Sequence, residues 1–189
     1  MVLIETRRLA DVVEIRSGEP THRINANSGD AGVKYQVFTP DTNAEPQFIE
    51  AEEGLRVVLP NELIFATIPK KIYRAPVTDR PLVASTNYMV LTPSAKVDPD
   101  FLTWWFNESH DAQHQKDLSE QGTSLTRLSM GPLKQFMIKL PSIEDQRKIG
   151  KFYRSSLRTQ ALLTRKMELL KQYTNGVLNQ RLESAAKHD

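Results

Sequence analysis

The sequence predicts an α+β fold, in which a domain with a mixed, mostly antiparallel sheet (1–140) precedes one long coiled-coil helix (141–189). Short runs of β-branched and aromatic residues recur between residues 33 and 92, separated by turn-forming segments, which is typical of strands. A capped apolar helix pattern begins at Asp98. From Ser142 the chain continues to its end without a proline, which indicates a helix on the order of 60 Å long.

The composition bounds the class of protein. A chain of 189 residues with 39% hydrophobic residues suffices for one ordinary domain and an appendage. The net charge of +2 does not by itself identify a nucleic-acid binder. The lack of cysteine excludes disulfides and thiolate metal sites. The N-terminus does not resemble a signal peptide, and no stretch approaches the roughly 18 apolar residues of a membrane span. We therefore expect a soluble, cytoplasmic protein with no membrane partner.

The first predicted element covers Leu9–Ile15. Its apolar residues at positions 9, 12 and 13 predict a short helix or a helix that leads into a strand. Arg16–Pro20 then breaks the pattern. The polar segment from Glu19 to Gly32 predicts a long loop, and long loops inside compact domains are often functional. An ordinary disordered surface loop is the alternative for this segment.

The middle of the chain supplies the strands of the predicted sheet. Alternating or continuous apolar residues mark them, and turn-forming residues separate them. The segment from Pro40 to Glu53 is acidic and rich in turn formers, which predicts a connection. The predicted strands cover Tyr35–Thr39, Leu55–Leu59, Glu62–Ile68, Ile72–Ala75, Pro81–Ser85 and Asn87–Thr92.

A shorter helix follows the predicted sheet. Asp98 suits the cap of this helix and Pro99 its first position. Its buried face is predicted to consist of Phe101, Leu102, Trp104, Trp105 and Phe106. A polar turn at Gln121–Leu128 and a last strand at Gln135–Leu140 then lead through Pro141 into the long helix.

The long helix has a start signal and an interaction seam. Ser142 can cap the first turn, and Asp145 stands where a capping box places its acid. Two lines of residues at a spacing of seven favour packing against another long helix, with an amphipathic helix lying on its own domain as the alternative. The residues predicted to form this dimer interface are Ile149, Tyr153, Ser156, Gln160, Leu163, Met167, Leu170, Thr174 and Val177.

The sequence gives little support for catalysis. It contains no glycine-rich phosphate loop, no Asn-Pro-Pro-aromatic tetrapeptide and no Gly-x-Ser-x-Gly motif. His110 and His114 could share a helix face, but a zinc site needs a third ligand that the spacing does not provide. We therefore predict no catalytic residue, no metal and no cofactor in this chain.

Basic and polar residues in predicted loops instead suggest DNA binding. Lysine and arginine neutralise phosphates, arginine and asparagine read base edges, and hydroxyls position the backbone. An ordinary solvated surface is the alternative. Arg16 opens the first of these loops, and the predicted DNA-binding residues are Thr21, His22, Arg23, Asn25, Lys70, Lys71, Tyr73, Arg74, Thr123, Ser124 and Arg127.

Several motifs, in this order, resemble the specificity subunit of type I restriction-modification systems. Leu9–Gly18 is similar to the opening of that family's target recognition domain, with Ala10 in place of its usual glycine. Glu62–Ile68 is similar to a family strand that normally starts with aspartate. The remaining similar segments are Asp100–Leu102, Gly122–Leu125 with Leu128, and Leu140–Ile149, and the tail from Leu169–Gln172 onward is similar to the close of the family's long helix.

The resemblance implies a half-sized specificity subunit with one target recognition domain. Such a chain would form a homodimer and read double-stranded DNA at a bipartite inverted repeat. It would do no chemistry itself. Its partners would be adenine methyltransferase subunits that use S-adenosylmethionine and an ATP-dependent restriction endonuclease and translocase subunit. The alternatives from other classes are a coiled-coil assembly adaptor without sequence reading and a small hydrolase or nuclease with a dispersed site.

Overall fold

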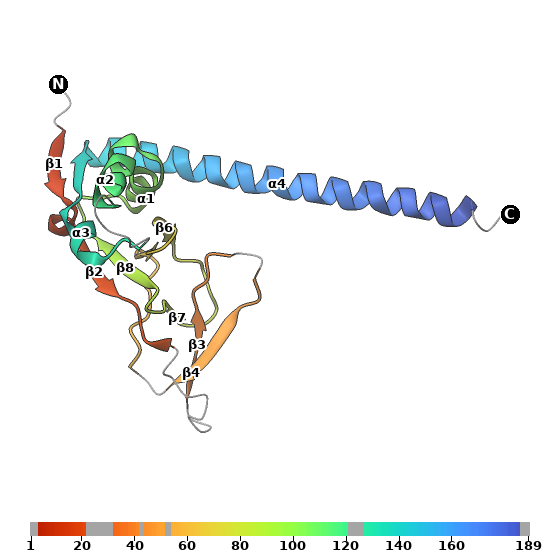
Figure 1. The fold of residues 1–189 in the computed structure, drawn as a ribbon, viewed down its shortest axis with the longest axis horizontal. Helices are drawn as coiled ribbons and strands as arrows, with labels where there is room; N and C mark the ends of the chain where they lie inside the picture. Colours follow the sequence, from red (N-terminus) through yellow and green to blue (C-terminus); the bar gives the residue numbers. More distant parts are fainter. Residues whose placement is uncertain (1–3, 22–31, 42–43, 52–53, 121–126, 186–189) are drawn as a thin grey trace. The chain divides into compact units, whose positions relative to one another are not determined.

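A computed structural model describes residues 4–21, 32–41, 44–51, 54–120 and 127–185 (Figure 1). The chain divides into two compact units, residues 1–150 and 151–189. The elements of the first unit are β1 (Glu5–Arg8), the 3-10 helix η1 (Leu9–Asp11), β2 (Val13–Ser17), β3 (Val33–Val37), β4 (Gln47–Ala51), β5 (Leu63–Ala66), β6 (Lys71–Arg74), β7 (Leu82–Val83), β8 (Tyr88–Pro93), α1 (Pro99–Glu108), α2 (His110–Glu120), α3 (Met130–Gln135) and β9 (Met137–Leu140). Helix α4 (Ile143–Ala185) begins in the first unit and forms the described part of the second.

The strands of the described residues form three sheets. The central one has the order β2-β8-β5-β6, a second pairs β1 with β9, and a third has the order β4-β3-β7. Every pair of strands is antiparallel except β3 with β7, so the prediction of a mixed, mostly antiparallel sheet domain is confirmed. The expectation of one sheet over residues 33–92 is wrong, because β3, β4 and β7 form one sheet whereas β5, β6 and β8 belong to another.

The central sheet is covered on both faces. All four residues of β5 are buried, and successive side chains point to opposite faces. Leu63 and Phe65 join the main core with α1, whereas Ile64 joins a second core with Phe38 and Val58. A strand buried on both faces must be apolar throughout, which explains the continuous hydrophobic run in the sequence.

Helix α1 begins as the sequence predicts. The Asp98 carboxylate accepts a hydrogen bond from the Phe101 N–H at 2.9 Å, and Pro99 occupies the first turn. Phe101, Leu102, Trp105 and Phe106 are buried in the main core, and Trp104 is partly buried against it. The aromatic residues of this helix therefore form core rather than a ligand site, as predicted.

Some local predictions were wrong. The described segment Leu55–Leu59 forms no strand, although the Val58 N–H donates a hydrogen bond to the Leu82 carbonyl (2.7 Å). The acidic connection Pro40–Glu53 contains β4, which pairs with β3. The sequence also did not predict β1, whose residues are exposed, or the short helix α3.

The start of α4 confirms the capping prediction. The Ser142 hydroxyl accepts a hydrogen bond from the Asp145 N–H (3.2 Å) and donates one to the Asp145 carboxylate (2.8 Å). Hydrogen bonds from Ser142 and Lys148 hold the pKa of Asp145 below its ordinary value. The helix therefore begins just after Pro141, where the sequence places it.

The first two turns of α4 pack within the first unit. The buried Gln146 amide accepts a hydrogen bond from the Asp98 N–H (3.0 Å) and donates to the carbonyls of Lys96 (3.1 Å) and Pro141 (3.0 Å). A β-carbon at Gly150 would lie 2.7 Å from both the Asp98 carboxylate and the backbone nitrogen of Phe101. Glycine at this position therefore permits close packing against the start of α1.

None of the helices in the described part of the chain has the length and hydrophobicity that a membrane span requires.

Candidate nucleic-acid interface

One end of the central sheet gathers segments from distant parts of the chain. The strand register pairs Ser17 with Met89 and pairs Ala66 with both Tyr88 and Lys71. The end of β2, the start of β8, the end of β5 and the start of β6 therefore lie together. We call the connections at this end, together with the first residue of β6, the loop end; it comprises residues 18–21, 67–71, 85–87 and 127–128.

Backbone hydrogen bonds fix the first loop-end segment. The Gly18 N–H donates to the Tyr88 carbonyl (3.0 Å), and the Glu19 N–H donates to the Ala84 carbonyl (2.7 Å). A β-carbon at Gly18 would lie 2.1 Å from the Ser85 carbonyl oxygen. Only glycine allows this approach of two backbones, which explains the glycine that closes the Leu9–Gly18 motif.

Similar bonds join the other loop-end segments. The Leu128 N–H donates to the Thr67 carbonyl (3.0 Å), and the Arg127 guanidinium donates to the Thr86 carbonyl (3.0 Å). The Thr67 hydroxyl donates to the Asn87 carbonyl (3.0 Å). Residues 127–128 thus lie against the 67–70 and 85–87 turns, although the sequence separates them widely.

The loop end contains part of the predicted DNA-binding set. Thr21, Lys70, Lys71 and Arg127 all lie there. Lys70 has a φ of 51°, a left-handed conformation that is uncommon for lysine and marks a tight turn between β5 and β6. The other predicted residues of these loops, His22, Arg23, Asn25, Thr123 and Ser124, lie outside the described residues.

Two predicted residues are not brought to the loop end. Arg74 pairs in register with Leu63, at the opposite end of β5, and forms an ion pair with Asp100 at 3.3 Å. The Tyr73 ring packs against Phe38 at 5.9 Å, and burial raises the pKa of its phenol. Both side chains contribute to packing around β6, and the structure does not group them with Lys70 and Lys71.

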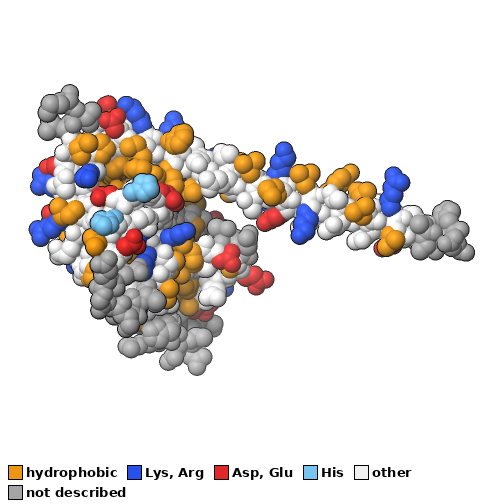
Figure 2. Space-filling model, turned by 45° about the horizontal axis from the view of Figure 1, so that its top comes forward, with side chains coloured by type: hydrophobic (Ala, Val, Ile, Leu, Met, Phe, Trp, Pro, Cys, Tyr) orange, Lys and Arg blue, Asp and Glu red, His pale blue; other side chains and the backbone are white. Residues whose placement is uncertain are grey.

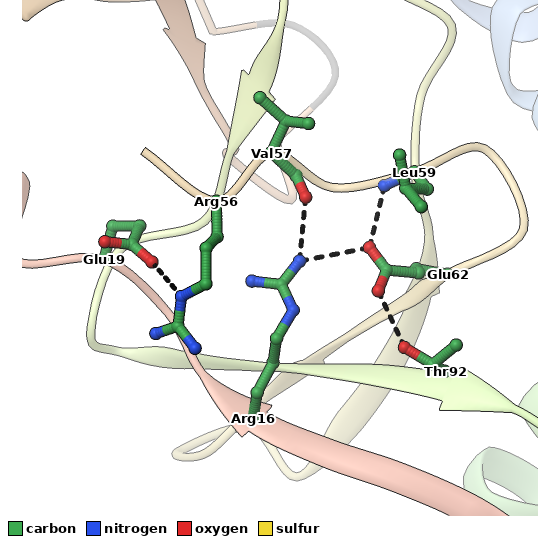
Figure 3. Close-up of polar contacts among 7 residues, drawn as sticks. All are labelled: Arg16, Glu19, Arg56, Val57, Leu59, Glu62 and Thr92. Carbon is green, nitrogen blue, oxygen red and sulfur yellow. Dashed lines mark hydrogen bonds and ion pairs between the residues drawn. The ribbon is translucent and has the colours of Figure 1, made fainter. Parts of the chain in front are cut away.

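Arg16, which the sequence placed at the start of a loop, is instead a strand residue in a polar network (Figure 3). Its guanidinium donates to the Val57 carbonyl (2.8 Å) and to the Glu62 carboxylate (3.1 Å). The buried Glu62 also accepts hydrogen bonds from the Leu59 N–H (2.8 Å) and the Thr92 hydroxyl (2.7 Å). This network holds the segment that was wrongly predicted as a strand.

A second ion pair in Figure 3 ties the same segment to the loop end. The Arg56 guanidinium lies 2.8 Å from the Glu19 carboxylate. Glu19 also accepts a hydrogen bond from the Thr21 N–H at its backbone carbonyl (2.8 Å). The Glu19 side chain therefore ties residues 54–59 to the loop end, and the Arg16 side chain holds the same segment to β2 and Glu62. Sequence reasoning missed both roles because the partners are distant in sequence.

Lys116 is a further basic residue that the sequence analysis missed. It is buried, donates to the Phe106 carbonyl at 2.5 Å and lies 4.1 Å from the centre of the Phe106 ring. Burial lowers its pKa to about 8; Glu108 opposes this shift, and the charges of Lys71 and Lys70 add to it. Lys116 therefore lies within electrostatic reach of both Glu108 and the lysines of the β5–β6 turn. No local sequence pattern marks it.

Among the described residues, no group of three or more histidine, cysteine, aspartate or glutamate side chains could hold a metal ion.

The predicted dimer residues of α4 differ in exposure. Ile149, in the first unit, is partly buried against the main core. Tyr153 and Ser156 are half-buried, and the predicted residues from Gln160 onward are exposed. The exposed fractions of Leu163, Met167, Leu170 and Val177 are 56%, 71%, 54% and 38%. Figure 2 shows hydrophobic side chains recurring along this helix among charged ones. An apolar line left exposed on a long helix is suited to packing against another helix.

Comparison with known protein families identifies the family of this chain. Residues 1–172 match the family of the type I restriction modification DNA specificity domain. The chain belongs to this family. The match includes the loop end and the larger part of α4. No curated protein matches the chain.

Solved structures from type I restriction-modification systems share the fold of this specificity domain. A chain from work on complex assembly and conformational transition of the type I R-M system aligns with a TM-score of 0.64 at 19% identity, covering 91% of this chain and 47% of that one. The HsdS subunit from Thermoanaerobacter tengcongensis aligns with a TM-score of 0.57 at 17% identity, covering 86% and 39%. The specificity domain described here thus spans less than half the length of either structure.

Proposed function

We propose that this chain is the DNA sequence-recognition subunit of a type I restriction-modification complex. The observation that carries the proposal is the loop end, where Thr21, Lys70, Lys71 and Arg127 lie at the same end of the central sheet although they come from distant segments. Lysine and arginine there would neutralise phosphates and fix the register of the protein on the duplex. The family match of residues 1–172 supports this reading of the loop end.

The proposed assembly is a homodimer formed through α4. The exposed line that contains Leu163, Met167, Leu170 and Val177 would pack against the same line of a second copy. Ile149 already contacts its own domain, so the seam would begin beyond it. Two copies related by a two-fold axis would read a bipartite inverted repeat, because half-sites mirror the symmetry of the protein.

The chemistry would belong to partner subunits. The chain would direct adenine methyltransferase subunits, which use S-adenosylmethionine, and a restriction endonuclease and translocase subunit, which uses ATP. Recognition of double-stranded DNA by this chain would then determine where those subunits act. The long, exposed apolar face of α4 supports a role in assembly.

The exposed apolar face of α4 also supports a second candidate function. A coiled-coil assembly adaptor would use α4 alone and would need no sequence reading by the first unit. It would bind any duplex weakly, with a salt dependence set by phosphate contacts only.

The test is a binding selection on randomised DNA duplexes with the full chain, purified together with the adenine methyltransferase of its own operon. An inverted-repeat consensus with an unread spacer is the expected result. An asymmetric consensus would retain sequence reading and replace the homodimer by a pair of different half subunits. Recovery of no consensus would overturn the proposal in favour of the adaptor.

A further inference from the structure

The ribbon formed by β3 and β4 presents an aromatic ring with two cations on its outer face. The strands are antiparallel, with Lys34 opposite Glu50 and Gln36 opposite Phe48. The phenyl ring of Phe48 is accompanied by the Lys34 ammonium at 5.0 Å and the Arg80 guanidinium at 6.0 Å. We call these five residues the ribbon face.

The alternation of side chains separates the ribbon face from the core. Tyr35 and Ala51 are buried on the inner side, together with Val83. Phe48 points the other way, and 43% of its surface is exposed. Each cation–π contact at an exposed site contributes only about 0.5–1 kcal/mol. Stability of the hairpin therefore gives little reason for a phenylalanine here, where a polar residue would suit water better.

The side chains of the ribbon face match those that read DNA. Glutamine pairs with adenine, glutamate accepts from cytosine, and phenylalanine contacts the thymine methyl group. Lys34 and Arg80 are both exposed and carry the charge that phosphates attract. A two-stranded ribbon also has the dimensions to enter the major groove.

The ribbon face is continuous in the chain with the loop end. Strand β7 pairs with β3 in parallel and leads directly into residues 85–87. Ser85 forms a bridge with Glu19, and the Gln36 N–H donates to the Pro81 carbonyl (2.9 Å). The backbone around β7 thus links the base of the ribbon to the loop end.

We propose that the ribbon face is a second DNA-contact surface, which enters the major groove beside the base pairs contacted by the loop end. Lys34 and Arg80 would contact phosphates, and Phe48 would contact a thymine methyl group. This inference rests on the proposed function, because it adds a reading element to the same recognition domain.

The test compares Lys34→Ala/Arg80→Ala and Phe48→Ala with the wild-type full chain. The probe is a fluorescent duplex with the selected consensus, titrated between 50 and 200 mM salt, and a scrambled duplex serves as reference. The loss of two phosphate contacts should reduce the slope of log affinity against log salt by about 1.8. Phe48→Ala should keep the slope and lower affinity for the consensus by about 10-fold, the size of one base contact.

Lys96→Ala/Lys139→Ala is the matched control. It removes the same charge from exposed positions, one beyond the end of β8 and one in β9, away from the loop end. If the salt slope of Lys34→Ala/Arg80→Ala equals that of the control variant, while the wild-type chain still prefers the consensus duplex, the ribbon proposal alone is overturned. Failure of the wild-type chain to prefer the consensus would instead overturn the proposed function, and the ribbon proposal with it.

Discussion

Glu62 is a buried carboxylate whose partners come from three parts of the chain: Arg16, Leu59 and Thr92. Removing one member of a buried ion pair leaves the other charge without compensation. We expect Glu62→Ala to lower the free energy of unfolding by about 3 kcal/mol, measured by urea denaturation. The segment around Leu59 should also lose protection in hydrogen exchange.

The exposed ion pair between Arg8 and Asp11 provides the control. Arg8→Ala should change the free energy of unfolding by less than about 1 kcal/mol, because water and salt screen exposed pairs. Equal effects of Glu62→Ala and Arg8→Ala would show that the Glu62 network does not stabilise the fold.

Lys116 should make stability depend on pH. The unfolded chain holds the Lys116 proton up to its ordinary pKa of 10.5, whereas the folded chain releases it at about 8. Between these values the unfolded state binds more protons, so stability rises with pH, by at most about 1.4 kcal/mol per pH unit.

Urea denaturation of the wild type and of Lys116→Met at pH 7 and pH 10 isolates this contribution. Groups common to both proteins cancel, and the wild type should gain stability relative to the variant as the pH rises. A difference that stays constant with pH would indicate that Lys116 keeps an ordinary pKa.

At the scale of elements, α4 offers a test of its own surface. Leu163 and Leu170 are exposed and lie seven residues apart on one line of the helix. Leu163→Asp/Leu170→Asp would place four charges in the seam of a homodimer. We expect the mass in light scattering to fall from two chains to one.

Gln172→Asp/Asn179→Asp adds the same charge at the same spacing on the opposite face. At 3.6 residues per turn, Gln172 lies about half a turn round the helix from Leu163. This variant should remain a dimer. A dimer that survives the leucine substitutions would mean that another surface of the chain forms the interface.

At the scale of the whole molecule, the two-fold dimer makes a prediction about DNA. A duplex with one half-site engages one recognition domain, whereas the full inverted repeat engages two through a single dimer. Affinity for the full repeat should exceed that for the half-site by about 10²-fold or more, since the second contact becomes intramolecular. Equal affinities in a gel-shift titration would argue against simultaneous reading by two copies.

The sequence predicts best where a structure depends on neighbours in the chain. Asp98 and Ser142 begin their helices as expected because a cap bonds to backbone groups three residues away. The apolar run of β5 likewise identified a buried strand. Local chemistry decides these features, so their signals are local too.

Features that depend on distant partners could not be predicted. Leu55–Leu59 has the composition of a strand, but Arg16 and Glu62 hold it where no ladder forms. The sequence around Lys116 is typical of an exposed lysine, and its burial depends on contact with Phe106 of α1. The loop end itself was predicted only as separate loops, because the register of the central sheet, which brings them together, appears in no single segment.

The residues of β5 tolerate substitution less than the exposed residues of the loop end. The β5 side chains are confined on both faces of the sheet, so a change there disturbs a core. Exposed side chains at the loop end, such as those of Lys71 and Arg127, carry no such constraint, whereas Gly18, Thr67 and Leu128 are fixed by close backbone contact or burial. New target sequences could therefore evolve by substitution of the exposed residues, while the framework beneath them is inherited unchanged.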